Sequence, residues 1–144
     1  MWVLTNFLLN KLKLIGRMEK NIHDGGCILI VEDDYINYMY LSEILEGKGY
    51  KFIHACNGEE SVDICQHNNS IKLILMDIKM PIMNGYTAST EIKIINPEVK
   101  IVAQTAYTET ELTDRAFDGG FDDYILKPIP EEKLLQIVDK YFKM

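Results

Sequence analysis

The chain has 144 residues, of which 22 are Asp or Glu and 15 are Lys or Arg, so its formal net charge at pH 7 is −7. This length suits one compact domain, and 47% hydrophobic with 26% charged residues is typical of a globular protein, not of a disordered or fibrous chain. Phosphate binding depends on clustered Lys and Arg, and the sequence has no such cluster. We therefore expect no direct nucleic-acid partner.

The first 26 residues differ from the rest. They carry four basic and two acidic side chains, a net charge of +2, which leaves −9 for residues 27–144. Their apolar start is interrupted by Asn6, Asn10 and Lys11, well short of the roughly 20 apolar residues that span a bilayer. The lysines follow the apolar run and no small-residue cleavage site appears, which argues against a signal peptide. We interpret residues 1–26 as a leader or linker remnant before a domain at 27–144, with no membrane partner.

Short apolar runs then alternate with segments of helical periodicity. The run 27–31 is rich in β-branched residues, and the apolar residues of 36–45 recur at helical spacing before Gly47 and Gly49. Four similar pairs follow: 51–55 with 59–67, 73–76 with 86–95, 100–104 with 109–117, and 124–126 with 131–142. The helix at 109–117 has a capping box, Thr108 to Glu111, and ends at Gly119 and Gly120. Fully apolar strands joined through helices predict an α/β fold, a doubly wound five-stranded parallel sheet.

The cysteines and histidines do not suggest a metal site. Cys27, Cys56 and Cys65 are odd in number and lack C-x-x-C spacing, so we expect small core residues in a reducing cytoplasm. His23, His54 and His67 are isolated in the sequence, and we expect none of them to be a ligand or a phosphodonor.

Polar residues instead follow the strands, where open α/β sheets bind their ligands. Glu32, Asp33 and Asp34 follow the first strand, Asp77 follows the third, Thr105 the fourth and Lys127-Pro128 the fifth. Clustered carboxylates repel one another unless a cation neutralises them, and their oxygens suit Mg²⁺. For Asp34 we favour a role at the start of the next helix, whereas Glu32, Asp33 and Asp77 predict a metal site.

Asp77 directly follows a buried strand, which is an unusual place for an acid. A carboxylate oxygen can attack phosphorus and form an aspartyl phosphate if a metal and other cations balance the charge of the phosphoryl group. Mg²⁺, Lys127 and the Thr105 hydroxyl would supply a divalent charge, a point charge and a hydrogen-bond donor. Thr105 considered alone is equally consistent with an ordinary hydroxyl at a strand end.

The ordered set Glu32-Asp33, Asp77, Thr105-Ala106, Tyr124 and Lys127-Pro128 resembles the receiver domain of two-component response regulators over residues 27–143. The resemblance implies a flavodoxin-like strand order of 2-1-3-4-5 and phosphorylation of Asp77. It implies Mg²⁺ bound by Asp33 and Asp77 directly, by Glu32 through water and by the Lys79 backbone carbonyl. Lys127 and Thr105 would contact the phosphoryl oxygens, and the Lys127-Pro128 bond would be cis.

The resemblance also implies partners and a switch. The phosphoryl group would come from a histidine on a kinase or phosphotransfer domain, or from a small phosphodonor, with the receiver catalysing the transfer. Thr105 would then move and Tyr124 rotate inward, repacking the surface of the family's fourth helix, fifth strand and fifth helix for a downstream protein. This chain has Glu32 where Asp is common. We also expect Lys79 and Tyr107 to slow phosphoryl hydrolysis by their bulk and charge.

Several functions and contexts stay open at this point. No output domain is expected after the last helix, which leaves a single-domain regulator, a receiver of a hybrid histidine kinase, or a phosphorelay intermediate. A haloacid-dehalogenase-like phosphatase needs an acid two residues after its nucleophile, where this chain has Lys79. A phosphate-independent docking module would not need the complete site, and a flavodoxin would need a phosphate loop after the first strand, where this chain has acids.

Overall fold

The computed structural model of the protein describes residues 5–12, 25–106 and 120–142. Its five strands form one parallel sheet in the order β2-β1-β3-β4-β5. This confirms the predicted doubly wound fold and the order implied by the resemblance. The elements are β1 (Cys27–Val31), α2 (Tyr35–Gly47), β2 (Lys51–Ala55), α3 (Gly58–His67), β3 (Ile71–Asp77), α4 (Gly85–Ile95), β4 (Lys100–Thr105), β5 (Asp123–Leu126) and α6 (Glu131–Phe142).

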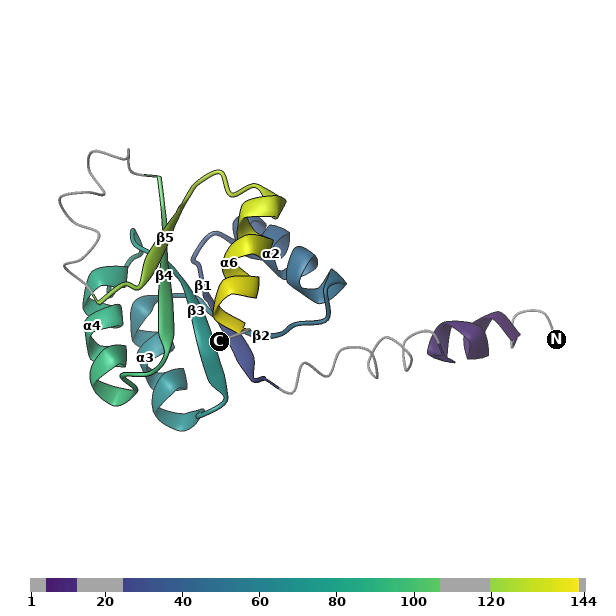
Figure 1. Cartoon of the computed structure of the whole chain (residues 1–144), viewed down its shortest axis with the longest axis horizontal. Helices are drawn as coiled ribbons and strands as arrows, with labels where there is room; N and C mark the ends of the chain where they lie inside the picture. Colours follow the sequence, from purple (N-terminus) through teal and green to yellow (C-terminus); the bar gives the residue numbers. More distant parts are fainter. Residues whose placement is uncertain (1–4, 13–24, 107–119, 143–144) are drawn as a thin grey trace.

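Helices cover both faces of the sheet (Figure 1). On one face, α2 and α6 pack through side chains such as Leu41 and Leu134 against alternate residues of the central strands. On the other face, α3 and α4 pack through side chains such as Val62 and Ile92 against the remaining strand residues. All five residues of β1 are buried, because a strand covered on both faces has no solvent side.

Side-chain caps begin three of the helices. Asp34 accepts hydrogen bonds from the backbone N–H groups of Ile36 and Asn37, so it caps α2 as favoured from the sequence. Asn57 and Asn84 cap α3 and α4 in the same way. These caps start each helix at a defined position after its strand end, and thereby position the loops between them.

Two details differ from the expectations. The third strand runs on through Asp77, so this residue is the last of β3 and not the first of a loop. Cys27 and Cys65 are buried free thiols, but Cys56 is exposed, so its assignment to the core was wrong. Cys56 follows the last residue of β2, where the chain leaves the covered part of the sheet.

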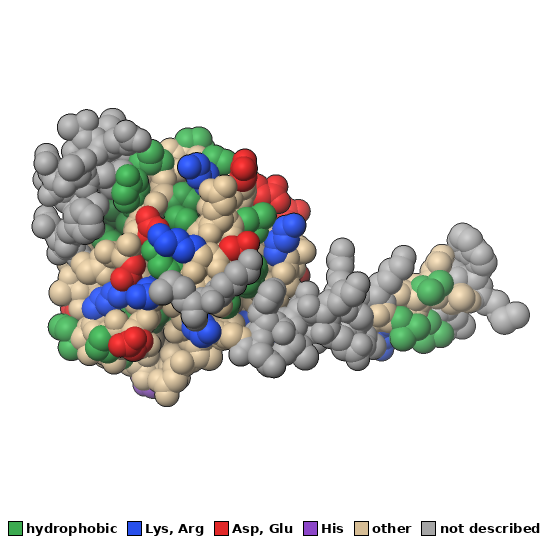
Figure 2. Space-filling model, in the orientation of Figure 1, with side chains coloured by type: hydrophobic (Ala, Val, Ile, Leu, Met, Phe, Trp, Pro, Cys, Tyr) green, Lys and Arg blue, Asp and Glu red, His purple; other side chains and the backbone are tan. Residues whose placement is uncertain are grey.

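Some sequence expectations lie outside the described residues: the helix at 109–117 with its Thr108 cap, Tyr107, Gly119, His23 and most of the leader. Residues 5–12 are helical, and their apolar side chains are exposed (Figure 2): Phe7, Leu8, Leu9 and Leu12. Within the described parts of the chain, no helix has the length and apolar character needed to cross a membrane.

The loop between β3 and α4 folds back tightly against the strand end. Gly85, the first residue of α4, donates its N–H to the Ile78 carbonyl at 3.0 Å. A Cβ atom at position 85 would lie 2.4 Å from the backbone carbonyl oxygen of Asp77 and 2.9 Å from the Cα of Ile78. Only glycine therefore allows α4 to begin this close to the end of β3.

We predict that Gly85→Ala destabilises the fold by about 2 kcal/mol or more, because the obstructing atoms are backbone and cannot rotate away. Gly47→Ala is the matched control, since a Cβ there meets nothing within 4 Å at the end of α2. The control should be neutral or stabilising by up to about 1 kcal/mol. Urea unfolding of the two variants measures this, and equal midpoints would contradict the close approach at Gly85.

Candidate functional site

Three carboxylates meet at the carboxyl edge of the sheet. Glu32 and Asp33 follow β1, and Asp77 ends the neighbouring strand β3. One ligand oxygen from each lies within 4.8 Å of the others. The Glu32 side chain is fully buried and that of Asp77 is 8% exposed, whereas Asp33 is exposed. The cluster therefore has a buried base and an open side.

Backbone and side-chain donors orient the two buried carboxylates. Glu32 Oε1 accepts the Asp34 N–H at 3.2 Å, and its Oε2 accepts the Asn37 side-chain amide. Asp77 Oδ1 accepts the Lys79 N–H at 3.2 Å. Because the Glu32 donors belong to the first turn of α2 and its cap, the start of that helix and the position of this carboxylate depend on each other.

Lys127 joins the cluster from the end of β5. Its Nζ lies 3.1 Å from Glu32 Oε2 and 3.3 Å from Asp77 Oδ2. Its backbone N–H donates to the Thr105 carbonyl at 2.7 Å, which ties the end of β5 to the end of β4. The Lys127-Pro128 bond is cis, as the resemblance implied. Thr105 itself is buried at the end of β4.

The electrostatics favour adding positive charge. Burial raises the pKa of Asp77 to about 7, the charge of Glu32 adds to this rise, and the Lys127 ammonium opposes it. Burial lowers the pKa of Lys127, but the charges of Asp77 and Glu32 outweigh this and raise it overall. Deprotonated Asp77 is thus costly in this site until further positive charge is bound.

The carboxylates open into a hollow of about 280 Å³ at the sheet edge. Four acidic residues and two lysines line it, which gives it a formal charge of −2: Glu32, Asp33, Asp34, Asp77, Lys79 and Lys127, together with Ile78, Thr105 and Ala106. Oxygen ligands that converge on a net negative hollow fit a hard divalent cation such as Mg²⁺. The residues present therefore fit the predicted metal.

Most of the predicted site residues line this one hollow, but Tyr124 does not. It lies on β5, is 42% exposed, and lines a different hollow of about 500 Å³ between β5 and α6. Its strand register pairs it with Ala103 of β4, two residues before Thr105. Tyr124 and Thr105 thus share one face of the sheet, because residues two apart on a strand point the same way.

Sequence reasoning missed two supports of the site. The first is Asn37, which the sequence analysis did not identify. It lies in the first turn of α2, three residues after the cap Asp34, a position from which a side chain can reach back to Glu32. His54 Nε2 lies 2.8 Å from the Glu32 carbonyl oxygen, and its ring stacks on Tyr38 with centroids 3.7 Å apart. These contacts join α2 and β2 to the Glu32 backbone. No local sequence pattern predicts them, because the residues are far apart in the chain.

A doubly wound parallel sheet with an acidic, lysine-containing hollow at its carboxyl edge defines an α/β protein with a candidate metal site, and comparison with known proteins identifies its family. The model of the response regulator receiver domain matches residues 28–139. The chain belongs to this family, whose members act in two-component and phosphorelay signalling.

Three similar proteins illustrate the family. Hybrid signal transduction histidine kinase L of Dictyostelium discoideum is 34% identical over 125 residues, 82% of this chain and 7% of that protein. The receiver domain of sensor histidine kinase PA1611 from Pseudomonas aeruginosa PAO1, solved with a magnesium ion in its active site cleft, is 28% identical with a TM-score of 0.77, covering 83% of this chain and 99% of that one.

The third is the receiver domain of the Saccharomyces cerevisiae response regulator Ssk1, solved with the histidine phosphotransfer protein Ypd1. It is 28% identical with a TM-score of 0.77, covering 82% of this chain and 89% of that chain. The chain spans between 7% and 28% of the length of the first curated relatives that it matches.

The raised pKa of Asp77 predicts a pH-dependent effect of Asp77→Asn in the presence of a chelator. A carboxyl whose folded pKa of about 7 exceeds the ordinary 3.8 favours the folded state below pH 4, and this contribution is lost as the pH rises through 7. We expect Asp77→Asn to be more stable than the wild type at pH 8 by about 1 to 4 kcal/mol, the upper figure being the full difference between these pKa values.

Urea unfolding at pH 5 and pH 8 measures this effect, and the difference between the two proteins should shrink at pH 5. Added Mg²⁺ at pH 8 should stabilise the wild type more than Asp77→Asn, because the ion binds the ionised carboxylate. A wild type at least as stable as Asp77→Asn at pH 8 without Mg²⁺ would disprove the electrostatic account.

Proposed function

We propose that the protein is a phosphoacceptor receiver of a phosphorelay, in which Asp77 accepts a phosphoryl group from a phosphohistidine. The observation that carries this proposal is the meeting of Glu32, Asp33, Asp77 and Lys127 in one hollow from the ends of three strands. In the transfer, an Asp77 oxygen forms a bond to phosphorus while the phosphorus–nitrogen bond to histidine breaks. The imidazole leaves with its electron pair and the product is an aspartyl phosphate.

The other site residues would hold the metal and the phosphoryl oxygens. Asp33 and Asp77 would bind Mg²⁺ directly, Glu32 through water, and the Lys79 carbonyl would complete the protein ligands. The ion supplies positive charge where phosphoryl oxygens gather in the transition state. Lys127 already reaches Asp77 at 3.3 Å and would pair with an incoming phosphoryl oxygen, to which the Thr105 hydroxyl would also donate. The protein would act as a signalling module that catalyses only its own phosphorylation and dephosphorylation.

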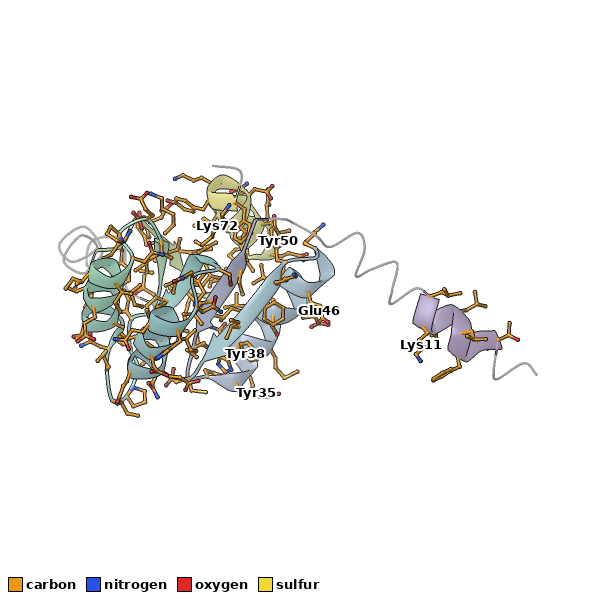
Figure 3. All side chains as sticks on the ribbon, turned by 90° about the horizontal axis from the view of Figure 1, so that it is seen from below. Lys11, Tyr35, Tyr38, Glu46, Tyr50 and Lys72 are labelled. Carbon is orange, nitrogen blue, oxygen red and sulfur yellow. The ribbon has the colours of Figure 1, made fainter. Side chains whose placement is uncertain are left out.

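The start of α2 offers a docking surface for the phosphodonor. Soon after Asp33 and Asp34, α2 carries two exposed pairs of large side chains, and the members of each pair are one helical turn apart: Tyr35 with Met39, and Ile36 with Tyr40. Figure 3 shows Tyr35 and Tyr38 at this end of α2, with Glu46 at the opposite end. A histidine kinase or histidine phosphotransfer domain that packs on this surface would bring its phosphohistidine to the hollow. The complex of the similar Ssk1 receiver with Ypd1 supports this class of partner.

We propose that phosphorylation is sensed through Thr105 and Tyr124. Two charge-assisted hydrogen bonds supply about 3 to 6 kcal/mol in total, comparable to the roughly 5.5 kcal/mol that moves a two-state population from 1:99 to 99:1. Tyr124 would turn inward on the face that it shares with Thr105. The surface that changes would include β5 and α6, which correspond to the fifth strand and fifth helix of the family, and would bind a downstream protein. The helix expected at 109–117 would form the rest.

The domain boundary, the similar proteins and the cysteines bear on the context of the receiver. We assign residues 27–144 to the receiver and 1–26 to a leader or linker remnant. The similarity to a hybrid kinase supports a receiver module of such a kinase as the alternative to a separate regulator. The cysteines of the described chain are free thiols, which supports a reducing, cytoplasmic location.

A phosphatase is disfavoured, because the position two residues after Asp77 holds Lys79 and not an acid.

Incubation with acetyl phosphate and Mg²⁺ tests the central step. The wild type should gain the mass of one phosphoryl group, and Asp77→Asn should gain none, because the amide is not a nucleophile toward phosphorus. Removing Mg²⁺ with a chelator should reduce the modification by at least about 100-fold, since the charge at phosphorus would then be uncompensated. Intact-protein mass spectrometry gives the result, and an unmodified wild type would refute the proposed function.

Two exposed isoleucines provide a matched test of docking. Ile36 on α2 is 81% exposed beside the hollow, and Ile94 on α4 is 78% exposed on the other face of the sheet. Ile36→Asp should slow phosphoryl transfer from a histidine phosphotransfer protein by about 10-fold or more, because a charge would be buried in an apolar contact. Its labelling by acetyl phosphate should not change.

Ile94→Asp should leave both reactions unchanged, since it introduces the same charge away from the proposed surface. Rates of phosphoryl loss from the labelled donor compare the variants. Equal rates for Ile36→Asp and the wild type would exclude this face of α2 as the docking surface.

A further inference from the structure

One buried polar side chain is not used by the site as described above. Gln104 of β4 has no exposed surface, and neither its amide nitrogen nor its amide oxygen has a hydrogen-bond partner among the described residues. Each buried amide atom without a partner costs about 1 to 3 kcal/mol. A leucine or methionine of similar volume would avoid this cost, so the presence of a polar side chain at position 104 needs an explanation.

The register of the sheet places Gln104 beside the phosphoacceptor. Asp77 of β3 and Gln104 of β4 are direct partners in the parallel ladder, and Gln104 pairs on its other side with Ile125 of β5. Two residues earlier, Leu75 and Val102 are also partners, and both belong to the core under α2 and α6. Because side chains alternate along strands, Gln104 and Asp77 lie on that same face, with side chains one strand spacing apart.

Lys127 lies next to Asp77 on this face of the sheet. It follows β5 by one residue, and its ammonium reaches across the ends of β4 and β3 to Asp77 Oδ2 and Glu32 Oε2. In the unmodified protein the Asp77 carboxylate is thus occupied by Lys127 on one oxygen and by the Lys79 N–H on the other. The Gln104 amide has no role in this arrangement.

We propose that Gln104 is a positioning residue for the phosphorylated state, an inference that rests on the proposed phosphorylation of Asp77. A phosphoryl group carries more negative charge than the carboxylate it modifies, so Lys127 moves from Asp77 Oδ2 to the phosphoryl oxygens. The Gln104 amide nitrogen then donates to the aspartyl oxygen that Lys127 leaves. The unpartnered amide destabilises the unmodified state, and its new hydrogen bond stabilises the phosphorylated one.

Gln104→Met tests this inference, because it keeps the side-chain volume and removes both polar atoms. The unmodified variant should unfold at a higher urea concentration than the wild type. Its affinity for beryllium fluoride, a phosphoryl mimic, in the presence of Mg²⁺ should fall by about 3- to 10-fold, which is the net worth of one hydrogen bond. Calorimetric titration of the full chain measures the affinity, and Gln104→Leu provides a second apolar replacement.

Leu75→Met is the matched control, since it makes a similar packing change on the same face without removing a polar atom. It should lower the stability slightly and leave the affinity for beryllium fluoride within about 2-fold of the wild type. A packing role for Gln104 would move stability and affinity in the same direction, whereas the proposal requires opposite directions.

Two outcomes would overturn the inference. If Gln104→Met is no more stable than the wild type, the amide already has a partner, such as a buried water, in the unmodified protein. If the variant binds beryllium fluoride as tightly as the wild type, the amide gains nothing on modification. Both outcomes differ from failure of the proposed function, in which the wild type itself would bind no beryllium fluoride and acquire no phosphoryl group from acetyl phosphate.

Discussion

The mutual repulsion of carboxylates at one edge of a parallel sheet is the constraint on which the rest of this structure depends. All five strands end at the same edge, so residues far apart in the sequence are forced into one hollow. Water screens the charges of Glu32 and Asp77 only weakly because both residues are buried, and the single charge of Lys127 balances only part of theirs. The cluster therefore fits a divalent cation, whose charge would in turn attract the phosphoryl group of the proposed transfer.

The helix starts hold this unfavourable arrangement in place. Donors from the cap and first turn of α2 orient Glu32, while the Lys79 N–H orients Asp77. Gly85 lets α4 begin against the end of β3, so the loop that carries Lys79 is short and closely packed. The start of α2 and the position of Glu32 are coupled, because the cap residue Asp34 and the first-turn residue Asn37 both donate to the Glu32 carboxylate.

The proposed docking surface and the proposed output surface lie on different elements. The exposed apolar residues of α2 adjoin the acidic ends of the strands, whereas Tyr124 and the hollow between β5 and α6 lie along the outer strand β5. The proposed docking surface on α2 adjoins the β5–α6 connection at Tyr40, whose hydroxyl donates to the Ile129 carbonyl at 2.7 Å. The strands β3 and β4, which carry Asp77, Gln104 and Thr105, lie between β1 and β5 in the sheet. A change at Asp77 has a short packed route to β5 through β4, and on this route the Gln104 side-chain amide has no hydrogen-bond partner within the described parts of the chain.

Local patterns in the sequence determined the alternation of strands and helices, the cap at Asp34, and the position of Glu32, Asp33, Asp77, Thr105 and Lys127 at strand ends, because periodicity and strand termination depend on near neighbours. The strand order and the cis bond came from the resemblance and were confirmed. Only the tertiary structure decided that Cys56 is exposed, that Asn37 and His54 support Glu32, and that the Gln104 side-chain amide beside Asp77 has no hydrogen-bond partner among the described residues. These features depend on which strands become neighbours and in what register, a long-range outcome of packing that no short stretch of sequence encodes.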